Sequence, residues 1–247
     1  MDSLKRARVL NANALKFLAA ALMLVDHIGY MLLPQVLFLR IVGRLSMPLF
    51  AFALSEGCRY TKNKAKHFFL LFTLAALCQA VYFFFDDGNL YMSILVTFSL
   101  SVLTIYALQF FKKTLFNKKS DGLDKGLAFT LFSAVLLCDF ALCQLFTIDY
   151  GFWGIMLPVF ASVFDFRGIP APALLQKLDC LPARVFALSI GLLLLAFSFG
   201  GIQFYCLLTI PILLLYNGKK GERDTKYFFY VFYPLHLAIL EGLCMFL

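Results

Sequence analysis

Charged and ionisable residues inside long apolar stretches are the first chemical feature of this 247-residue sequence. Asp26 and His27 lie within one such stretch, and Arg40, Arg44 and Glu56 lie in or beside the next. Arg40 and Arg44 are four positions apart, so they share one face of a helix. A charged side chain at the centre of a membrane costs about 2.5–3.5 kcal/mol, and such residues usually serve a function. We therefore treat these five residues as candidates for an intramembrane site.

Part of this group also has a structural explanation. A short turn through Pro34 would make the two stretches antiparallel neighbours and bring Asp26 level with Arg44. Such a buried ion pair could serve only to fix the packing of the helices. Glu56 could likewise pair with Arg59, three positions further along the same helix. This explanation accounts for neither Arg40 nor His27.

The two histidines at membrane depth, His27 and His236, are candidates for proton transfer. The unperturbed pKa of histidine lies near neutral, so either ring could act as a general base. Alternatively, each ring could form a structural hydrogen bond between helices. Pro234 should kink the helix beside His236. We expect His27 and its charged neighbours to form one wall of a site, and His236 to form the other.

Nine apolar stretches must position these residues. The chain is 62% hydrophobic and 15% charged, with a mean hydropathy of +0.85, which no ordinary soluble domain shows. About nineteen helical residues cover roughly 28 Å, close to the thickness of the hydrocarbon core. We predict an all-α, polytopic integral membrane helical bundle of about nine transmembrane helices, forming a single transmembrane domain over 1–247. The stretches cover 15–33, 40–58, 67–85, 90–111, 126–147, 150–166, 183–199, 201–216 and 227–247.

The basic residues fall in alternate loops between these stretches. Apart from Arg40 and Arg44, every Lys and Arg precedes the first stretch or follows an even-numbered one, while the other loops carry Asp86, Asp87 and Asp149. The positive-inside rule then places the N-terminus in the cytoplasm and the C-terminus outside it. The net charge of +8 is explained by topology and by contacts with anionic membrane lipids, so we expect no nucleic-acid partner.

Motifs for several other chemistries are missing from the sequence. No HExxH or comparable ligand spacing is present, so we expect no metal. The seven cysteines lack CxxC spacing and are interpreted as small core residues. A serine nucleophile elbow and the glycine-rich phosphate-binding patterns are also absent.

Several short motifs, spread over the whole chain, resemble the TraX family. The most specific are DHIG over 26–29, GR-x-x-x-P-x-F-A-F over 43–52 and YP-x-H over 233–236. Asp149-Tyr150-Gly151 and Tyr216-Asn217-Gly218 follow the same pattern, whereas the region 112–147 is similar only in hydropathy. The motifs occur in the family's order, so the resemblance covers essentially the full length.

The resemblance implies a multi-pass acetyltransferase of the bacterial inner membrane. The founding member of the family modifies the N-terminal amine of a conjugative pilin subunit. The intramembrane His and Arg are also similar to those of membrane O-acyltransferases that modify surface sugars. The expected donor is cytoplasmic acetyl-CoA or another acyl-CoA, without a metal. The expected acceptor is an extracytoplasmic or membrane-embedded peptide amine or glycan hydroxyl.

Physical reasoning gives the matching residues their roles. His27 would take the proton of the acceptor, and Arg44 or Arg40 would stabilise the oxyanion. Asp26 would orient His27 or Arg44, and His236 would be a second acid/base or a covalent acyl carrier. The remaining substrate-binding candidates are Arg40, Glu56, Asn89, Asp149, Tyr150 and Tyr233. The candidate contacts for the donor phosphates are Lys62, Lys64, Lys66, Lys219 and Lys220.

Two other classes of function remain open at this point. Arg40 and Arg44 could form the anion site of a transporter or flippase, although no internal repeat is visible. The protein could also be a non-catalytic assembly factor for a pilus or conjugation apparatus, with its intramembrane charges paired structurally.

Overall fold

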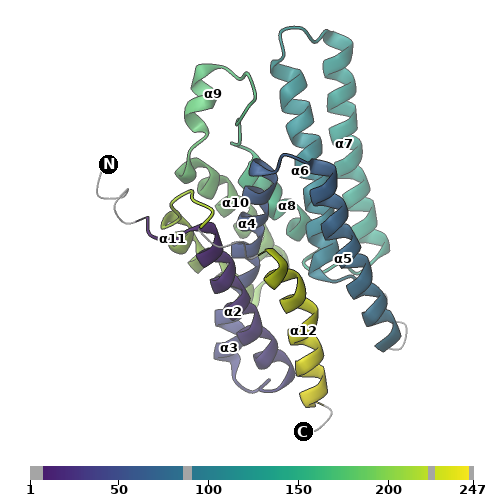
Figure 1. The fold of residues 1–247 in the computed structure, drawn as a ribbon, viewed down its shortest axis with the longest axis vertical. Helices are drawn as coiled ribbons and strands as arrows, with labels where there is room; N and C mark the ends of the chain where they lie inside the picture. The colour runs from purple at the N-terminus through teal and green to yellow at the C-terminus, as the bar shows by residue number, and fades with distance from the viewer. Residues whose placement is uncertain (1–7, 86–90, 222–225, 245–247) are drawn as a thin grey trace. The chain divides into compact units, whose positions relative to one another are not determined.

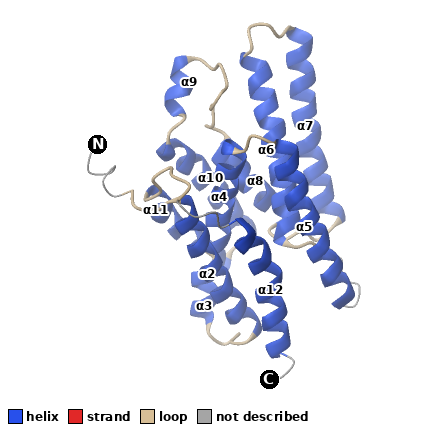
Figure 2. Cartoon of the chain, in the orientation of Figure 1, coloured by secondary structure: helices blue, strands red, loops and turns tan. Residues whose placement is uncertain are grey.

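Helices account for the regular structure of the chain. The computed structural model describes residues 8–85, 91–221 and 226–244, and for 81, 82, 84, 85, 226, 227 and 230 it describes only the backbone. Figure 2 shows helices joined by loops over the described residues. The β-structure in that part of the chain consists of two isolated bridges, Leu10–Tyr216 and Met92–Ile148. The prediction of an all-helical fold is confirmed.

Each of the nine apolar stretches coincides with helical structure in the described residues (Figure 1). Two of them, 40–58 and 201–216, are divided into two segments. The elements are α2 (Ala12–Met31), α3 (Leu37–Gly43), α4 (Ser46–Tyr60), α5 (Lys64–Phe85), α6 (Ile94–Phe116), α7 (Gly122–Leu145), α8 (Gly151–Ser162), α9 (Ala173–Leu178), α10 (Leu181–Phe199), the 3₁₀ helix η1 (Gly201–Leu208), α11 (Thr209–Leu214) and α12 (Lys226–Cys244).

Length and apolarity identify a membrane protein. Among the described residues, five segments are long and apolar enough to cross a membrane, namely α2, α3 with α4, α6, α7 and α10. Large apolar side chains on these helices are exposed, including Leu137 and Leu145 of α7 and Phe197 of α10. Such side chains suit a lipid environment. By contrast α8 has 12 residues, or about 18 Å, against a hydrocarbon core of about 30 Å.

The chain forms two compact units. Unit 1 contains Met1–Ala53 and Leu192–Leu247, and unit 2 contains Leu54–Gly191. The boundaries fall within α4 and α10. The single transmembrane domain expected over 1–247 stays a prediction.

In unit 1, α2 packs against both α3 and α12. The Phe17 ring lies 5.1 Å from the rings of Phe228 and Phe229, and the Cys244 thiol donates to the Met31 carbonyl at 3.6 Å. The N-terminal part of α2 therefore contacts the N-terminal part of α12, and the two C-terminal parts also meet. This order of contacts makes α2 and α12 parallel.

Helices α2 and α3 approach each other closely through two glycines. A Cβ atom on Gly29 would lie 2.7 Å from Cβ of Leu39. A Cβ atom on Gly43 would overlap the side chain of Asp26. Small residues allow close backbone approach between membrane helices. The expected turn through Pro34 lies between these helices and makes them antiparallel.

Proline explains why the two apolar stretches in unit 1 are divided. Pro48 has no N–H to donate to the carbonyl of Arg44, four positions earlier, so α3 and α4 are separate helices. Pro211 has the same effect near the start of α11. Before it, Gly200 and Gly201 both adopt positive φ, at 65° and 52°, and lead into η1. The sequence-based expectation of uninterrupted stretches is therefore wrong at these two places.

In unit 2, α6 packs against α5, α7 and α8. Asp121 begins α7 with a capping box, in which its side chain accepts from the N–H of Asp124 at 2.7 Å. Tyr150, with φ of 58°, begins α8. The connection from α8 to α10 contains α9 and several of the charged residues described below.

Candidate functional site

The two histidines that were predicted to lie at membrane depth meet in unit 1. Nδ1 of His27, on α2, lies 2.9 Å from Nε2 of His236, on α12. Nδ1 of His236 lies 2.8 Å from the carbonyl oxygen of Phe232. The His236 side chain is buried and stacks on the Phe232 ring, with ring centroids 4.9 Å apart. Tyr233 contacts His236 edge to face at 5.7 Å.

The hydrogen bonds assign the tautomers of both rings. A carbonyl oxygen can only accept, so Nδ1 of His236 carries a proton. When His236 is neutral, its Nε2 is an acceptor, and Nδ1 of His27 must donate to it. The remaining nitrogen, Nε2 of neutral His27, then has an unprotonated lone pair. The described residues supply no hydrogen bond to this nitrogen.

Asp26 holds two arginines beside this pair. Nη2 of Arg44 donates to both carboxylate oxygens of Asp26, at 2.8 and 2.6 Å. Nη1 of Arg40 lies 2.9 Å from Oδ1 of Asp26 and donates to its backbone oxygen at 3.1 Å. The Arg40 guanidinium also lies over the Tyr30 ring, 5.0 Å from its centroid. The structure thus contains the Asp26–Arg44 pair that the sequence suggested, and it places Arg40 on the same carboxylate.

Two local features bring both arginines to the Asp26 carboxylate. One is the break between α3 and α4, and the other is the absence of a side chain at Gly43. Arg44 lies in the break, and its side-chain Nε donates to the carbonyl of Arg40 at 3.4 Å. Any side chain at Gly43 would occupy the space of the Asp26 carboxylate. The local sequence therefore lets a carboxylate of α2 reach two guanidinium groups at the end of α3.

Gln203 on η1 is a polar neighbour that the sequence analysis missed. It is 3% exposed, and its Oε1 accepts from Nη1 of Arg44 at 3.4 Å. A glutamine after a Gly-Gly pair in an apolar stretch was the available signal. Its partner lies 159 positions away, so only the tertiary structure reveals the contact.

The other predicted site residues are divided between the two units. Tyr233, Lys219 and Lys220 belong to unit 1, with the histidine pair. Asn89 lies outside the described residues. Those of unit 2 are Glu56, Lys62, Lys64, Lys66, Asp149 and Tyr150.

Lys219 and Lys220 are exposed in a loop that is hydrogen-bonded to the start of α2. Their carbonyls accept from the N–H groups of Ala12 and Asn13, at 2.8 and 3.2 Å. The N–H of Ala14 is bound by the Asn11 side chain at 2.9 Å. These contacts fix the loop on α2, the helix that carries the candidate base.

The residues at the start of α8 have local structural roles in unit 2. Oδ1 of Asp149 accepts from the Tyr91 hydroxyl, and its carbonyl accepts from Thr97 Oγ1, both at 2.7 Å. Tyr150 adopts the left-handed backbone conformation before α8. Asp139, which has no partner evident from the sequence, lies 2.6 Å from Thr104 Oγ1 through its Oδ2.

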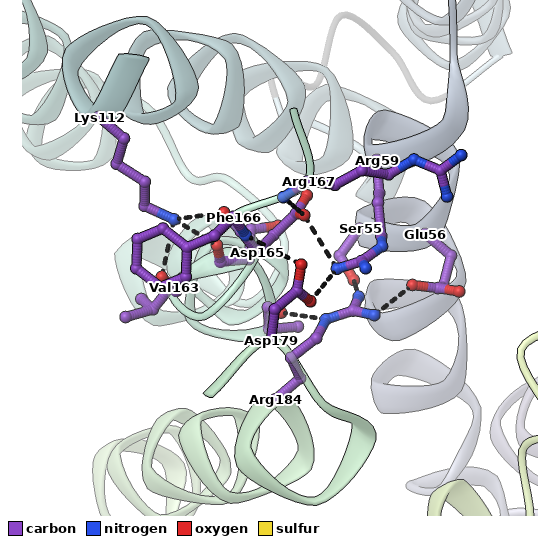
Figure 3. Close-up of polar contacts among 12 residues, drawn as sticks. Ser55, Glu56, Arg59, Lys112, Val163, Asp165, Phe166, Arg167, Asp179 and Arg184 are labelled. Atoms are coloured by element: carbon purple, nitrogen blue, oxygen red, sulfur yellow. Dashed lines mark hydrogen bonds and ion pairs between the residues drawn. The ribbon is translucent and has the colours of Figure 1, made fainter. Parts of the chain in front are cut away.

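A second charge cluster lies in unit 2 (Figure 3). Nη1 of Arg59 donates to Asp165 at 2.9 Å and to Asp179 at 2.5 Å. Oδ2 of Asp179 also accepts from the N–H of Phe166 at 3.2 Å. These bonds join the end of α4 to both ends of the connection that contains α9. We call this cluster, with Glu56, Arg184 and Lys112, the unit 2 network.

Glu56 has a partner far away in the sequence. Nη1 of Arg184 lies 2.5 Å from Oε1 of Glu56, and both side chains are 6% exposed. Arg184 also donates to the carbonyl of Ala161 at 3.2 Å and to Ser55 Oγ at 3.4 Å. Glu56 and Arg59 thus both have ion-pair partners far away in the sequence, and the pair expected between them within the helix stays a prediction. Tertiary packing brings α10 and the α9 connection to α4, which spacing along one helix cannot predict.

Lys112 completes the unit 2 network. Its ammonium donates to three carbonyls, those of Ser162, Val163 and Asp165, at 2.9, 2.7 and 3.0 Å. It also lies 4.7 Å from the centre of the Phe166 ring. An ammonium has three N–H bonds, so all of them are used. Lys112 thus caps the end of α8, and for this residue the expected contact with lipid headgroups is wrong.

The described residues contain no group of three or more His, Cys, Asp or Glu side chains that could hold a metal ion. The groups that the candidate site in unit 1 offers are one unprotonated imidazole nitrogen, a carboxylate and two guanidinium groups. A base next to fixed positive charge can take a proton while the cations stabilise a developing anion.

Comparison with known proteins gives a family for this arrangement. No solved structure matches the chain. A protein of Dichelobacter nodosus described as "Probable fimbrial assembly protein FimC, serogroup H1" is 28% identical over 267 aligned positions, which cover 96% of this chain and 97% of that protein. The family model described as TraX protein matches residues 11–244, nearly the whole length. The chain belongs to the TraX family.

Proposed function

We propose that the protein is an integral membrane acyltransferase that moves an acetyl group from acetyl-CoA to an amine or hydroxyl acceptor. The observation that carries the proposal is the His27–His236 pair, because its tautomers leave Nε2 of His27 unprotonated. A ring fixed in this way is ready to take a proton, as a general base must be. The acetyltransferase activity implied by the family resemblance agrees with this chemistry.

The reaction needs one proton carrier and one anion-stabilising group. The acceptor nitrogen or oxygen attacks the thioester carbonyl carbon and forms the new N–C or O–C bond. The acceptor's proton passes to Nε2 of His27, while Arg44 or Arg40 stabilises the oxyanion. The C–S bond then breaks, and His27 returns the proton to the departing thiolate. The products are the acetylated acceptor and CoA as a free thiol.

His236 acts in this scheme by positioning His27. Its Nε2 receives the His27 hydrogen bond, and its Nδ1 is held by Phe232. Both nitrogens are therefore occupied, which disfavours His236 as a covalent acyl carrier. Asp26 positions the two arginines.

Lys219 and Lys220 are the proposed contacts for the donor phosphates. Both are exposed and lie in the loop bonded to the start of α2. His27 follows Ala12 by fifteen positions, or about 22 Å along the helix. The pantetheine arm of CoA would cover this distance. The role expected for Lys62, Lys64 and Lys66, which are exposed in unit 2, stays a prediction.

The proposal includes nine membrane spans, a cytoplasmic N-terminus and an extracytoplasmic C-terminus. The parallel arrangement of α2 and α12 supports an odd number of spans, because first and last spans are parallel only then. The alternation of basic loops supports the same orientation. The donor would then enter from the cytoplasm and the acceptor from the other side.

A second candidate function is that of a non-catalytic assembly factor for a pilus. The D. nodosus relative is described as a probable fimbrial assembly protein, and the similarity covers nearly the full length of both chains. In that case the histidine and arginine contacts would only hold α2, α3 and α12 together.

A transfer assay separates the two functions. Protein purified in detergent is incubated with acetyl-labelled acetyl-CoA and with a short peptide bearing a free N-terminal amine or a disaccharide bearing hydroxyls. Mass spectrometry then measures the acetylated probe for wild type, His27→Ala and His67→Ala. His67 is the matched control, since it binds the Tyr106 hydroxyl at 2.7 Å in unit 2.

We expect wild type and His67→Ala to acetylate a probe. His27→Ala should be slower by about 100-fold or more, because general-base catalysis contributes at least that factor. No transfer by wild type, together with normal surface pili in cells carrying His27→Ala, would overturn the acyltransferase proposal. That result would favour the assembly factor.

A further inference from the structure

Two buried polar atoms of unit 1 have no hydrogen-bond partner among the described residues, one on η1 and one at the start of α11. They are Nε2 of Gln203 and Oγ1 of Thr209, on side chains that are 3% and 0% exposed. The thiol of Cys206 lies within reach of the Gln203 amide, but sulfur is a weak acceptor and does not replace an oxygen partner for Nε2. An unsatisfied buried donor costs about 1–3 kcal/mol, so each such atom requires an explanation.

The backbone around Gln203 is unusual for an apolar stretch. Gly200 and Gly201 have positive φ, and the eight residues Gly201–Leu208 form a 3₁₀ helix. Runs of 3₁₀ helix beyond three or four residues are uncommon. Within membranes, irregular backbone occurs where it is buried in protein or lines a cavity.

This irregular segment meets the other helix break of unit 1. Arg44 lies between α3 and α4, and its Nη1 contacts Oε1 of Gln203 at 3.4 Å. Substrate sites in membrane proteins are often formed where discontinuous helices meet. The same arginine binds Asp26, so Gln203 belongs to the candidate site.

Gln203 is not needed to hold Arg44 in place. Asp26 already binds Nη2 of Arg44 through two short contacts of 2.8 and 2.6 Å. The contact to Gln203 is much longer, at 3.4 Å, and involves a neutral acceptor. The contact fixes the direction of the Gln203 amide, so that Oε1 faces Arg44 and Nε2 is left for another acceptor.

We propose that Nε2 of Gln203 donates a hydrogen bond to the carbonyl oxygen of the acyl group and, with the Arg44 guanidinium, stabilises its negative charge during transfer. This inference rests on the proposed acyltransferase function. In the step concerned, the acceptor forms its bond to the carbonyl carbon and the C=O electron pair moves to oxygen. When the C–S bond breaks, the carbonyl re-forms. A prepositioned neutral donor and a cation together suit such an oxyanion.

The test uses two variants of Gln203 and one control in the full-length protein. Gln203→Met keeps the side chain's size but removes both polar atoms, and Gln203→Glu keeps an oxygen facing Arg44 but removes the N–H donor. The control is Gln79→Met in unit 2. Nε2 of Gln79 donates to the carbonyl of Tyr91 at 2.9 Å, and its Oε1 accepts from the N–H of Ser93 at 3.3 Å. Each protein is assayed for acetyl transfer from labelled acetyl-CoA to the peptide or disaccharide probe, and for its melting temperature without ligand.

We expect Gln203→Met to slow transfer by about 100-fold or more, as the loss of one oxyanion donor does. Its melting temperature should be equal to or above that of wild type, because a buried unsatisfied donor has been removed. Gln203→Glu should also lose transfer while it remains folded. Gln79→Met should melt at a lower temperature and still transfer the label.

Two results would overturn the inference alone. One is normal transfer by Gln203→Met, and the other is a lower melting temperature for both Gln203 variants that matches their loss of transfer. An absence of transfer in wild type is a different result, because it overturns the proposed acyltransferase function and this inference together.

Discussion

In unit 1, two arginines share the carboxylate of Asp26, whereas in the unit 2 network three cations lie among three carboxylates. In the unit 2 network Lys112 uses every N–H, and Arg184 bonds to an acid, a hydroxyl and a carbonyl, although Nε of Arg59 is buried without a hydrogen-bond partner. Unit 1 retains a surplus positive charge, an unprotonated imidazole nitrogen and a buried amide without an acceptor.

Charge balance distinguishes a structural cluster from a candidate catalytic or binding site. A charge-balanced network stabilises the fold and has no net charge left for a ligand. An unbalanced one leaves hydrogen-bonding and charge capacity unused, and a substrate with an acyl oxygen and an ionisable acceptor could use both. We therefore expect substitutions in unit 2 to lower stability and substitutions in unit 1 to lower transfer.

The largest effect on stability is expected from Arg184→Met. The substitution leaves Glu56 as a buried carboxylate without its ion-pair partner, and breaking such a pair costs about 3–5 kcal/mol. Denaturant unfolding in detergent measures the change. The double variant Glu56→Met with Arg184→Met should recover most of the loss, because two apolar side chains then replace the pair. A single variant as stable as wild type would remove the distinction between the two regions.

A smaller effect, on rate rather than stability, is expected from His236→Ala. Without its acceptor, the His27 ring loses its fixed orientation, and such misplacement costs about 100-fold in rate. His236→Gln should restore much of the rate, because the glutamine oxygen can accept from Nδ1 of His27. The transfer assay with labelled acetyl-CoA gives kcat and KM, and we expect the fall in kcat. If His236→Gln is as slow as His236→Ala, His236 acts as more than a positioning residue.

The smallest effect is expected from Gly43→Ala. The new methyl group would overlap the Asp26 side chain, and overpacking of this kind costs about 1–3 kcal/mol. Gly57→Ala is the matched control in α4, since its Cβ would lie 3.6 Å from the nearest His67 atoms. The control should be neutral or more stable by up to about 1 kcal/mol. Equal unfolding free energies for the two variants would contradict the close approach of α2 and α3.

The sequence predicts the helices well and their interruptions poorly. Apolar length alone locates the helical segments, because burial in lipid or protein requires the same composition throughout. The breaks at Pro48 and Pro211 were missed, although both prolines remove a backbone donor that an uninterrupted helix needs. Proline alone does not locate such breaks, because Pro158 and Pro234 lie within the continuous helices α8 and α12.

The candidate site was predictable where its partners are neighbours in sequence. The turn at Pro34 makes α2 and α3 adjacent, so the Asp26–Arg44 pair follows from helix depth. His236 could be grouped with His27 because both are histidines at membrane depth. The long-range partners of Gln203, Glu56 and Arg59 are more than a hundred positions away, and spacing within one helix gives no indication of them. Only tertiary packing decides which helices supply those contacts.

His236 accepts from Nδ1 of His27, and this leaves Nε2 of neutral His27 unprotonated. Histidine-selective ¹⁵N labelling tests this directly, because the chain contains only three histidines. The spectrum of the purified protein is recorded at a pH where the rings are neutral, with His27→Ala and His67→Ala used for assignment. We expect Nδ1 of His27 to carry the proton and Nε2 to be unprotonated. A proton on Nε2 of neutral His27 would contradict it.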